Sequence, residues 1–312
     1  MSSSSRPRLI LDCDPGHDDA MAILMAARHA DLVGITTVAG NAPLEATTRN
    51  ALLVTQIADI DVPVHAGAAR PLMVEPHPAS HIHGESGLAG PVLPEPEREP
   101  AGHDAVAWII ETVRAEEGIW LVPIGPLTNI AMAFRQAPDI VDRVAGVSIM
   151  GGSAGPGNVT PTAEFNIWHD PEAAAIVFDS GADVLRMCGL NLTWQYQVDD
   201  EVVAALDAMG SRTAGFAADL FRFFLDANEA RSGRRQAPLH DPCAVMAVTH
   251  PELFESRSRH VAVETRGVHT VGMTVVDERN FLVGAEPNTE VMYGIDRDRA
   301  MRLFLDTVAG YR

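Results

Sequence analysis

The chain has 312 residues, of which 46% are hydrophobic and 21% charged, and its formal net charge at pH 7 is −19. Because nucleic-acid binding by bulk electrostatics needs a basic surface, this charge argues against a nucleic-acid partner. The chain has no lysine, which excludes a catalytic lysine. No apolar run reaches the roughly 18 residues that cross a bilayer, so no membrane partner is expected.

Along the N-terminal part of the chain, short apolar runs alternate with helical patterns. We expect strands at residues 8–13, 32–38, 118–123, 144–150 and 182–188. We expect helices at residues 20–28, 44–57, 104–114, 126–136 and 171–180. Continuous apolar strands separated by amphipathic helices indicate a single α/β domain with a Rossmann-like core, whose mostly parallel open sheet is covered by helices on both faces.

Other segments depart from this alternation. Residues 75–100 are rich in Pro, Gly and His and form a connection whose length is typical of a functional lid. Residues 199–235 have a helical, partly aromatic pattern, and residues 261–276 alternate like strands. A helix at residues 297–308 is expected to close the domain.

The N-terminal sequence MSSSSRPR lacks the apolar region of a signal peptide. We expect residues 1–8 to be a disordered arm and residues 9–312 to form the single domain. The three cysteines, Cys13, Cys188 and Cys243, are odd in number and lie in apolar surroundings. They are expected to be reduced core thiols, which favours a cytoplasmic protein.

The stretch LILDCDPGHDDAMAIL, residues 9–24, places four aspartates within eight residues between an apolar strand and a helix. The helix dipole favours acidic residues at a helix N-terminus, so capping would explain one of them. Three converging carboxylates, Asp14, Asp18 and Asp19, would raise one another's pKa unless a cation neutralised them. Oxygen ligands without His or Cys favour a hard cation, Ca²⁺ or Mg²⁺.

Two later polar clusters also follow apolar runs. The first lies in residues 151–174 and contains Asn158, Glu164 and Asn166. Its donors and acceptors suit a polyhydroxylated ligand, although an Asx-rich surface loop would have the same composition. In the second, LHDPCAVMAV, His240 and Asp241 precede a helix that begins with Pro242, and the alternative is that Asp241 only caps this helix.

Together these clusters resemble the nucleoside hydrolase family of the inosine-uridine-preferring type, over nearly the whole chain. The opening D-x-D-P-G-x-D-D at residues 12–19 matches the signature of that family. Further matches follow in the family's order: TTVAGN ending at Asn41, PIGPLTNIA at 123–131, GNVTPTAEFN at 157–166 and HDP at 240–242. The resemblance implies an enzyme that hydrolyses the N-glycosidic bond of ribonucleosides to ribose and free base, in nucleoside salvage or catabolism, as a homodimer or homotetramer.

The resemblance also implies roles for individual residues. Ca²⁺ would be held by Asp14, Asp19, Asp241 and the backbone carbonyl of Ile124. Asp14 would also be the general base that takes a proton from a calcium-bound water. The substrate would be bound by Asp18, Asn41, His83, Asn158, Glu164, Asn166, His240 and Asp241. Among these, His240 would stand near the nucleobase as general acid, with His83 of the loop HIHGESGL assisting.

The chain departs from this family in the helical region before the His–Asp pair, where members that cleave inosine well often carry a tyrosine. Phe223, Phe224 and Asn228 stand there instead, so both purine and pyrimidine nucleosides stay open as substrates. Trp168 could stack on a base or pack in the core. His17, inside the signature, is expected to face solvent.

Other functions are compatible with parts of the pattern. A strand ending in Asp12 and Asp14 also resembles the start of a haloacid-dehalogenase-type phosphatase with Mg²⁺, but Pro15, Gly16 and the lack of lysine do not fit one. A calcium-stabilised protein that binds nucleosides or ribose without turnover would need no base beside an activated water. A hydrolase of a related N- or C-riboside is a further alternative.

Overall fold

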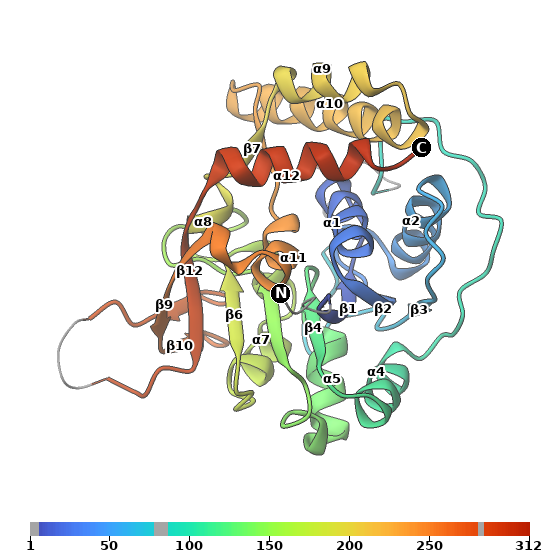
Figure 1. Cartoon of the computed structure of the whole chain (residues 1–312). Coiled ribbons are helices and arrows are strands. Elements are labelled where there is room, and N and C mark those ends of the chain that lie inside the picture. Colours follow the sequence, from blue (N-terminus) through green and yellow to red (C-terminus); the bar gives the residue numbers. More distant parts are fainter. Residues whose placement is uncertain (1–5, 78–86, 280–283) are drawn as a thin grey trace, which may run out of the picture.

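The computed structural model describes residues 6–77, 87–279 and 284–312 (Figure 1). Its centre is an eight-stranded sheet in the order β3-β2-β1-β4-β5-β6-β12-β9. The strands are β1 (Arg8–Cys13), β2 (Asp31–Thr37), β3 (Val64–Ala66), β4 (Ile119–Pro123), β5 (Gly146–Met150), β6 (Leu185–Cys188), β9 (Phe254–Arg259) and β12 (Thr289–Ile295). Only β9 runs antiparallel to its neighbour, β12. The sheet is the mostly parallel open sheet that the alternating pattern predicts.

Helices cover both faces of the sheet. On one face, α1 (His17–His29), α2 (Leu44–Ile57) and α11 (Pro242–Thr249) pack against the sheet. The helices α9 (Asp200–Met209), α10 (Arg212–Ser232) and α12 (Arg297–Ala309) pack on the outer side of this layer, mainly against α1 and α2 and against one another. The other face packs against α4 (Ala105–Ala115), α5 (Thr128–Gln136) and α7 (Pro171–Phe178). Alternation along a strand explains the two layers, because Leu9 and Leu11 of β1 belong to the first core and Ile10 to the second.

Shorter elements shape the edge of the sheet where the strands end. Helices α6 (Phe165–His169) and α8 (Leu190–Thr193) lie in the connections that follow β5 and β6. The strands β7 (Gln197–Val198) and β8 (Ala237–Pro238) form a two-stranded antiparallel ribbon. Because β7 precedes α9 and β8 follows α10, this ribbon fixes both ends of the α9–α10 pair next to the sheet.

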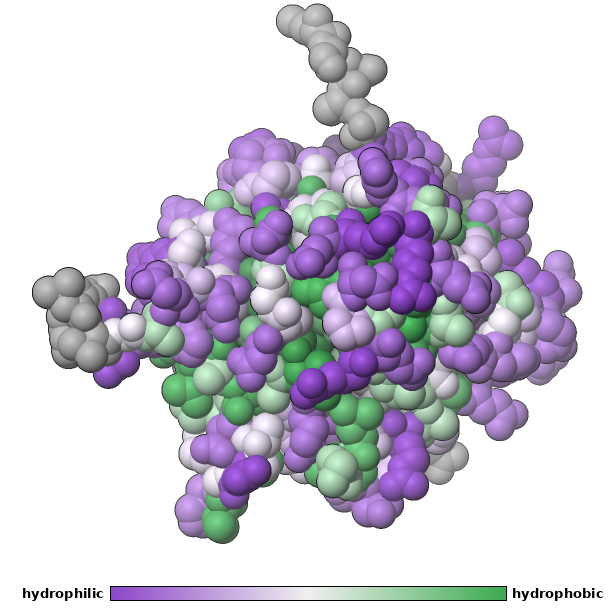
Figure 2. All heavy atoms as spheres, turned by 90° about the horizontal axis from the view of Figure 1, so that it is seen from below, coloured by the Kyte–Doolittle hydropathy of each residue, from purple (hydrophilic) through white to green (hydrophobic). Residues whose placement is uncertain are grey.

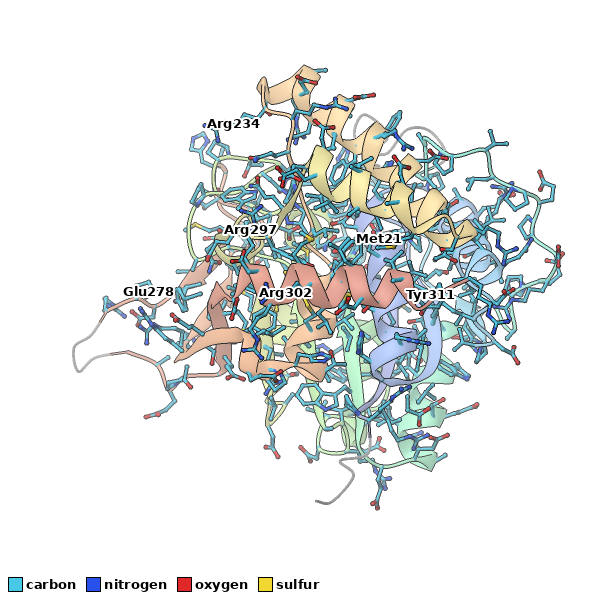
Figure 3. The ribbon with its side chains drawn as sticks, turned by 45° about the horizontal axis from the view of Figure 1, so that its top comes forward. Met21, Arg234, Glu278, Arg297, Arg302 and Tyr311 are labelled. Carbon is cyan, nitrogen blue, oxygen red and sulfur yellow. The ribbon has the colours of Figure 1, made fainter. Side chains whose placement is uncertain are left out.

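The C-terminal helix α12 closes the first layer, as expected (Figure 3). Beyond it, the Tyr311 hydroxyl donates a hydrogen bond to the Leu24 carbonyl of α1 at 2.7 Å. The side chain of Phe304 on α12 is fully buried and its ring contacts Phe221 of α10. The chain end therefore connects α1, which carries part of the aspartate-rich stretch, to α10.

Most predicted elements are confirmed, with β1 and α2 correct at both ends and the others within a few residues. The strands β3, β9 and β12 are additional to the prediction. Residues 261–276 form a separate ribbon of β10 (Val261–Val263) and β11 (Thr274–Val276) instead of joining the main sheet. Strand β1 begins at Arg8, as the expected strand does, and the arm expected at residues 1–8 overlaps it by this one residue.

One face of the molecule is mostly hydrophilic (Figure 2). Figure 2 shows the face at the bottom of Figure 1, where polar and charged residues surround smaller apolar areas. No helix in the described parts of the chain is both long and apolar enough to span a membrane. Cys13, Cys188 and Cys243 are buried free thiols, as predicted.

Candidate active site

The site lies where the winding of the sheet changes direction. From β1 the chain continues to β2 and β3 on one side, whereas β4, β5 and β6 follow on the other. Open α/β sheets bind ligands in the crevice at such a point, outside the carboxyl ends of the strands. Asp14 directly follows β1 and Ile124 directly follows β4. The Ile124 N–H donates to the Asp12 carbonyl at 2.8 Å, which holds the two strand ends together.

Asp19 ties the first turn of α1 to the loop after β1. Its Oδ1 accepts the Asp14 N–H at 3.1 Å, and its Oδ2 accepts the Gly16 N–H at 3.0 Å. The capping role offered as an alternative is therefore real for Asp19. It does not account for Asp14 or Asp18.

Asp14 has one engaged and one orphaned carboxylate oxygen. Its Oδ2 accepts the Asn41 N–H at 2.6 Å. Its Oδ1 is buried and has no hydrogen-bond partner among the described residues. A buried carboxylate oxygen without a partner is costly, which points to a group that binds there.

Two glycines make room for this carboxylate. A Cβ on Gly40 would lie 2.1 Å from Oδ2 of Asp14, and a Cβ on Gly125 would lie 2.5 Å from Oδ1. Both distances are too short for any side chain, so the close approach requires glycine at each position. Asp14 is thus held between the loops that follow β2 and β4.

Three carboxylates converge beside Asp14 from segments far apart in the sequence. One oxygen from each of Asp18, Asp19 and Asp241 lies within 4.8 Å of the other two, and all three residues are buried. Asp241 stands at the start of α11, but its side chain makes no capping hydrogen bond. Burial together with the charges of Asp18 and Asp19 raises the pKa of Asp241 well above its usual range.

This donor set fits a hard cation. The donors are carboxylate oxygens, one of them orphaned on Asp14. Burial, and after it the charge of Asp19, raises the pKa of Asp14, and a cation would stabilise the ionised carboxylates. Asp14, Asp19 and Asp241 were placed at the metal from the sequence, and the structure brings all of them to this crevice. It also places Asp18, for which the resemblance implies substrate binding, beside Asp19 and Asp241.

A second polar group follows β5, around α6. Glu164 accepts the N–H groups of Gly152 at 2.9 Å, Asn166 at 3.0 Å and Ile167 at 3.2 Å. Burial raises the pKa of Glu164 to about 7, although these N–H groups act in the opposite direction. The Asn166 side-chain amide donates to the Ile124 carbonyl at 2.8 Å. This contact links the group to the strand end beside Asp14.

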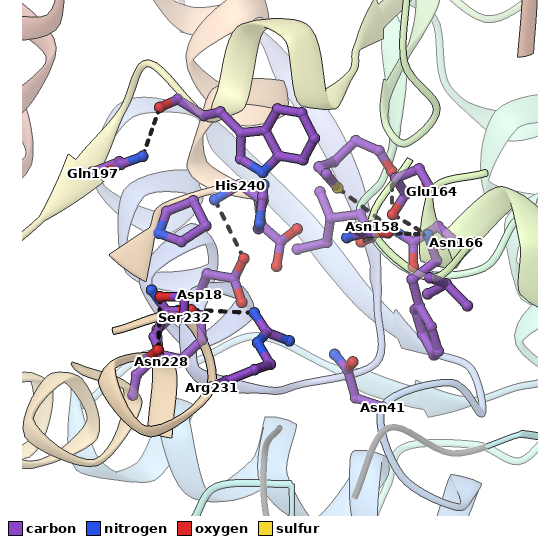
Figure 4. A pocket seen from close by; sticks show the side chains of 18 of the residues that line it. Asp18, Asn41, Asn158, Glu164, Asn166, Gln197, Asn228, Arg231, Ser232 and His240 are labelled. Carbon is purple, nitrogen blue, oxygen red and sulfur yellow. Dashed lines mark hydrogen bonds between the residues drawn. The ribbon is translucent and has the colours of Figure 1, made fainter. Parts of the chain in front are cut away.

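These groups meet in one pocket of about 760 Å³ (Figure 4). Its lining includes the sequence-assigned residues Asp18, Asn41, Ile124, Asn158, Glu164, Asn166, His240 and Asp241. Asp14 and Asp19 are buried and do not belong to this lining. His83 lies in residues 78–86, outside the described part of the chain.

The opposite side of the pocket is built by α10 and the β7–β8 ribbon. The sequence named the region around 223–240 but singled out few of the lining residues there. The additional ones are Trp194, Gln197, Arg231, Ser232, Arg234, Gln236 and Pro238. Trp194 follows β6 and α8, so the rule that strand ends carry ligand contacts could have found it. The others have no signal in the local sequence.

His240 lies between the two sides. Its backbone N–H donates to Asp18 Oδ2 at 3.3 Å, and its ring Nδ1 lies 2.6 Å from the Thr193 hydroxyl oxygen. Burial, with the charge of Arg231, lowers the pKa of His240 to about 4, so the ring is neutral at neutral pH. Because Thr193 engages Nδ1, Nε2 is the ring nitrogen that can contact a ligand.

Two expectations about aromatic rings are resolved by the structure. His17 is fully buried, and the prediction that it faces solvent is wrong because its ring stacks between α1 and α10 on Phe223 and Phe224. Trp168 lines the pocket and contacts the His77 ring, with 5.2 Å between ring centroids. Core packing alone therefore does not describe Trp168.

Comparison with known proteins places this geometry in a family. Residues 9–302 match the family described as inosine-uridine preferring nucleoside hydrolase. The chain is 44% identical over 312 residues to the pyrimidine-specific ribonucleoside hydrolase RihA of Shewanella sp. (strain MR-7), covering 98% of this chain and 97% of that protein. It is also 44% identical over 308 residues to the protein of the same name from Escherichia coli (strain K12), covering 97% and 98%.

A solved structure agrees. The purine-preferring ribonucleoside hydrolase from Gardnerella vaginalis superimposes with a TM-score of 0.91 and 32% identity, over 97% of this chain and 98% of that one. These matches favour hydrolysis over the phosphatase and the binding protein without turnover. The chain belongs to the inosine-uridine preferring nucleoside hydrolase family and is a ribonucleoside hydrolase.

Proposed function

We propose that this ribonucleoside hydrolase acts on pyrimidine ribonucleosides, with Ca²⁺ as cofactor and Asp14 as the general base. The observation that carries the proposal is the convergence of buried carboxylates at the floor of a pocket whose lining also includes the amides of Asn41, Asn158 and Asn166 and the carboxylate of Glu164. The relatives that are 44% identical are named pyrimidine-specific, which supports that substrate class, whereas a purine-preferring neighbour is 32% identical.

The oxygen-only donor set supports the cofactor. Ca²⁺ would be held by Asp14, Asp19, Asp241 and the Ile124 carbonyl, and it would lower the pKa of a water molecule and orient it. The absence of a capping bond leaves the Asp241 carboxylate available for this role. Asp18 adds negative charge beside these ligands.

The Asp14 carboxylate has one oxygen available to accept a proton. The Asn41 N–H fixes its Oδ2, so Oδ1, which has no partner within the described ranges, is the oxygen that takes the proton from the attacking water. The backbone at Gly40 and Gly125 lies close against the carboxylate on both sides. The same contacts would position the water for attack on the anomeric carbon.

The ribose is held on the α6 side of the pocket. Asn158, Glu164 and Asn166 would bind its hydroxyl groups, with Asn41 and Asp18 on the side of β1. The transition state of glycoside hydrolysis resembles an oxocarbenium ion, and the carboxylates near the sugar stabilise its positive charge. On the other side, the neutral His240 ring would donate a hydrogen bond from Nε2 to the departing base.

A panel of nucleosides tests the substrate class. We expect uridine and cytidine to be hydrolysed at least about tenfold faster, as kcat/KM, than inosine, adenosine or guanosine, since pocket contacts of this kind discriminate by that order. 2′-Deoxyuridine should be a poor substrate because it lacks the 2′-hydroxyl, so the buried polar groups that would bind this hydroxyl are left without a partner. The measurement is released reducing sugar. Equal rates on purine and pyrimidine nucleosides would contradict the assignment.

Glu164 predicts a pH dependence of substrate binding. Its raised pKa of about 7 means that the carboxyl group is protonated below this pH and ionised above it. A ribose hydroxyl donates best to the ionised form, so the KM for uridine should fall as the pH rises from about 6 to about 8. In Glu164→Gln this dependence should disappear, while Glu111→Gln, on the exposed side of α4, should keep it. An unchanged profile in Glu164→Gln would refute the role.

The ionisation of Glu164 also affects stability. Because the pKa of Glu164 is raised in the folded protein, its protonation favours folding below the ordinary glutamate pKa of 4.5, and this contribution is lost as the pH rises through about 7. Substrate-free protein should therefore gain stability from Glu164→Gln at the higher pH.

We also propose that the protein is a cytoplasmic homodimer or homotetramer that takes part in nucleoside salvage or catabolism. The buried free thiols support a reducing compartment. Light scattering of the purified protein measures the oligomeric state, and a monomer at micromolar concentration would contradict it.

A further inference from the structure

The pocket carries opposite charges on its two sides. Asp18, Glu164 and Asp241 supply carboxylates, whereas Arg231 and Arg234 line the side formed by the end of α10. In the view of Figure 4, Glu164 lies across the pocket from Arg231. The formal net charge of the chain is −19, so bulk composition does not explain two cations in this lining.

Arg231 is oriented by its own helix. It stands in the last turn of α10, and its Nη2 donates to the Asn228 side-chain oxygen at 3.2 Å. The Asn228 amide nitrogen in turn donates to the Gln236 carbonyl. Figure 4 shows the Arg231 side chain extending from the end of α10 toward the interior of the pocket. Arg231 is exposed, and its hydrogen bond to Asn228 orients the guanidinium on this side of the pocket.

Arg231 has no carboxylate as a counter-ion in the part of the chain that the structure describes. The acidic residues nearest to it on α10, Asp226 and Glu229, both pair with Arg235. Its one hydrogen bond there is to a neutral amide. The positive charge of Arg231 is thus free to act on a negative group inside the pocket.

We propose that Arg231 stabilises the negative charge that develops on the departing base, and that it thereby favours bases of the uracil type, which leave as delocalised anions. This inference rests on the proposed function and extends it to the leaving group. A planar guanidinium can donate two N–H groups to a ring oxygen and nitrogen that share such a charge.

During the reaction, positive charge develops on the sugar and negative charge on the base, at opposite sides of the pocket. The bond from C1′ to the base nitrogen breaks and its electron pair leaves with the base, while the water oxygen bonds to C1′ and Asp14 takes a water proton. The base anion later takes up a proton from solvent. Positive charge on the sugar then faces the carboxylates and negative charge on the base faces Arg231, which stabilises the transition state more than the neutral substrate.

The first test uses leaving bases of different acidity. Arg231→Gln should lower the single-turnover rate on uridine about tenfold, the size expected for a lost charge-assisted hydrogen bond. On 5-fluorouridine, whose base is the more stable anion, the loss should be clearly smaller. Arg231→Lys should retain most of the rate on both, and Arg302→Gln, on the exposed face of α12, should match the wild type (Figure 3).

Equal losses on uridine and 5-fluorouridine would show a structural role and overturn the inference, as would a wild-type rate in Arg231→Gln. A binding test separates this inference from the proposed function, because it needs no turnover. By calorimetry, the 5-nitrouracil anion should bind Arg231→Gln about tenfold more weakly than the wild type, while neutral uracil binds both alike. If the wild type hydrolyses no nucleoside, the proposed function fails, and this difference in base binding alone supports or refutes the role of Arg231.

Discussion

Replacing Asp14 with asparagine should lower kcat on uridine at least about 10³-fold, because a positioned general base contributes about 10²–10⁴-fold and the variant also loses a ligand of the cation. Asparagine has nearly the same shape and can still accept the Asn41 N–H, so the loop after β1 should keep its conformation. Substrate binding, followed by the fluorescence of Trp168 and Trp194 in the pocket lining, should survive.

The matched control is Asp12→Asn, on the same strand two residues earlier. The Asp12 carboxylate is buried and accepts the Thr36 hydroxyl at 2.5 Å and the Asn129 amide at 2.7 Å, and it does not line the pocket. Its replacement should keep kcat within about tenfold of the wild type, since lost single hydrogen bonds of this kind cost about that much. If Asp14→Asn turned over as fast as Asp12→Asn, Asp14 would not be the base.

The sequence predicts the floor of the site because that part is local. Asp14, Asp18 and Asp19 fall within six residues at a strand-to-helix junction, and strand ends in α/β sheets face the ligand. Asp241 enters only through the family resemblance, since it is far away in the chain. Asp18 lies beside Asp19 and Asp241 because of the way Pro15 and Gly16 turn the chain into α1. The spacing of the aspartates in the sequence does not determine the geometry of this turn.

The strands that escaped prediction lack the pattern of a buried strand. β9 is the edge strand of the sheet, and its sequence FESRSR is mostly exposed, so no apolar run marks it. β3 has only three residues. β12 mixes apolar residues with Glu290, which pairs with Arg186 of β6, and with Gly294. Their pairing partners, rather than their own sequences, make these segments strands.

The base side of the pocket is the least predictable part, because it is assembled by tertiary packing. Arg231 and Trp194 meet there only because the β7–β8 ribbon brings the segment before α9 against the segment after α10. The periodicity of α10 identifies a helix and its apolar face. It does not reveal that the last turn reaches the crevice of a sheet whose first strand lies some two hundred residues earlier.

Removal of the cation should have the second large effect. Dialysis against a chelator should lower kcat on uridine at least about 100-fold, because the attacking water loses the ion that lowers its pKa. The carboxylates of Asp18, Asp19 and Asp241 would then face one another without a counter-charge. Without the cation, the buried Oδ1 of Asp14 would also have no partner among the described residues. The folded protein should therefore become less stable as well.

The expected fall in Tm follows from mass action. A cation present at a hundred times its Kd stabilises the folded state by about 2.7 kcal/mol, which in a domain of this size corresponds to a Tm change of about 4 °C. Adding Ca²⁺ back should restore both kcat and Tm, whereas Mg²⁺ should restore less, because it demands stricter octahedral geometry than a cluster of carboxylates and one carbonyl offers. In Asp19→Asn the Ca²⁺-dependent Tm shift should shrink, since one ligand has lost its charge. Full turnover in protein shown to be metal-free by elemental analysis would mean that these carboxylates converge for another reason.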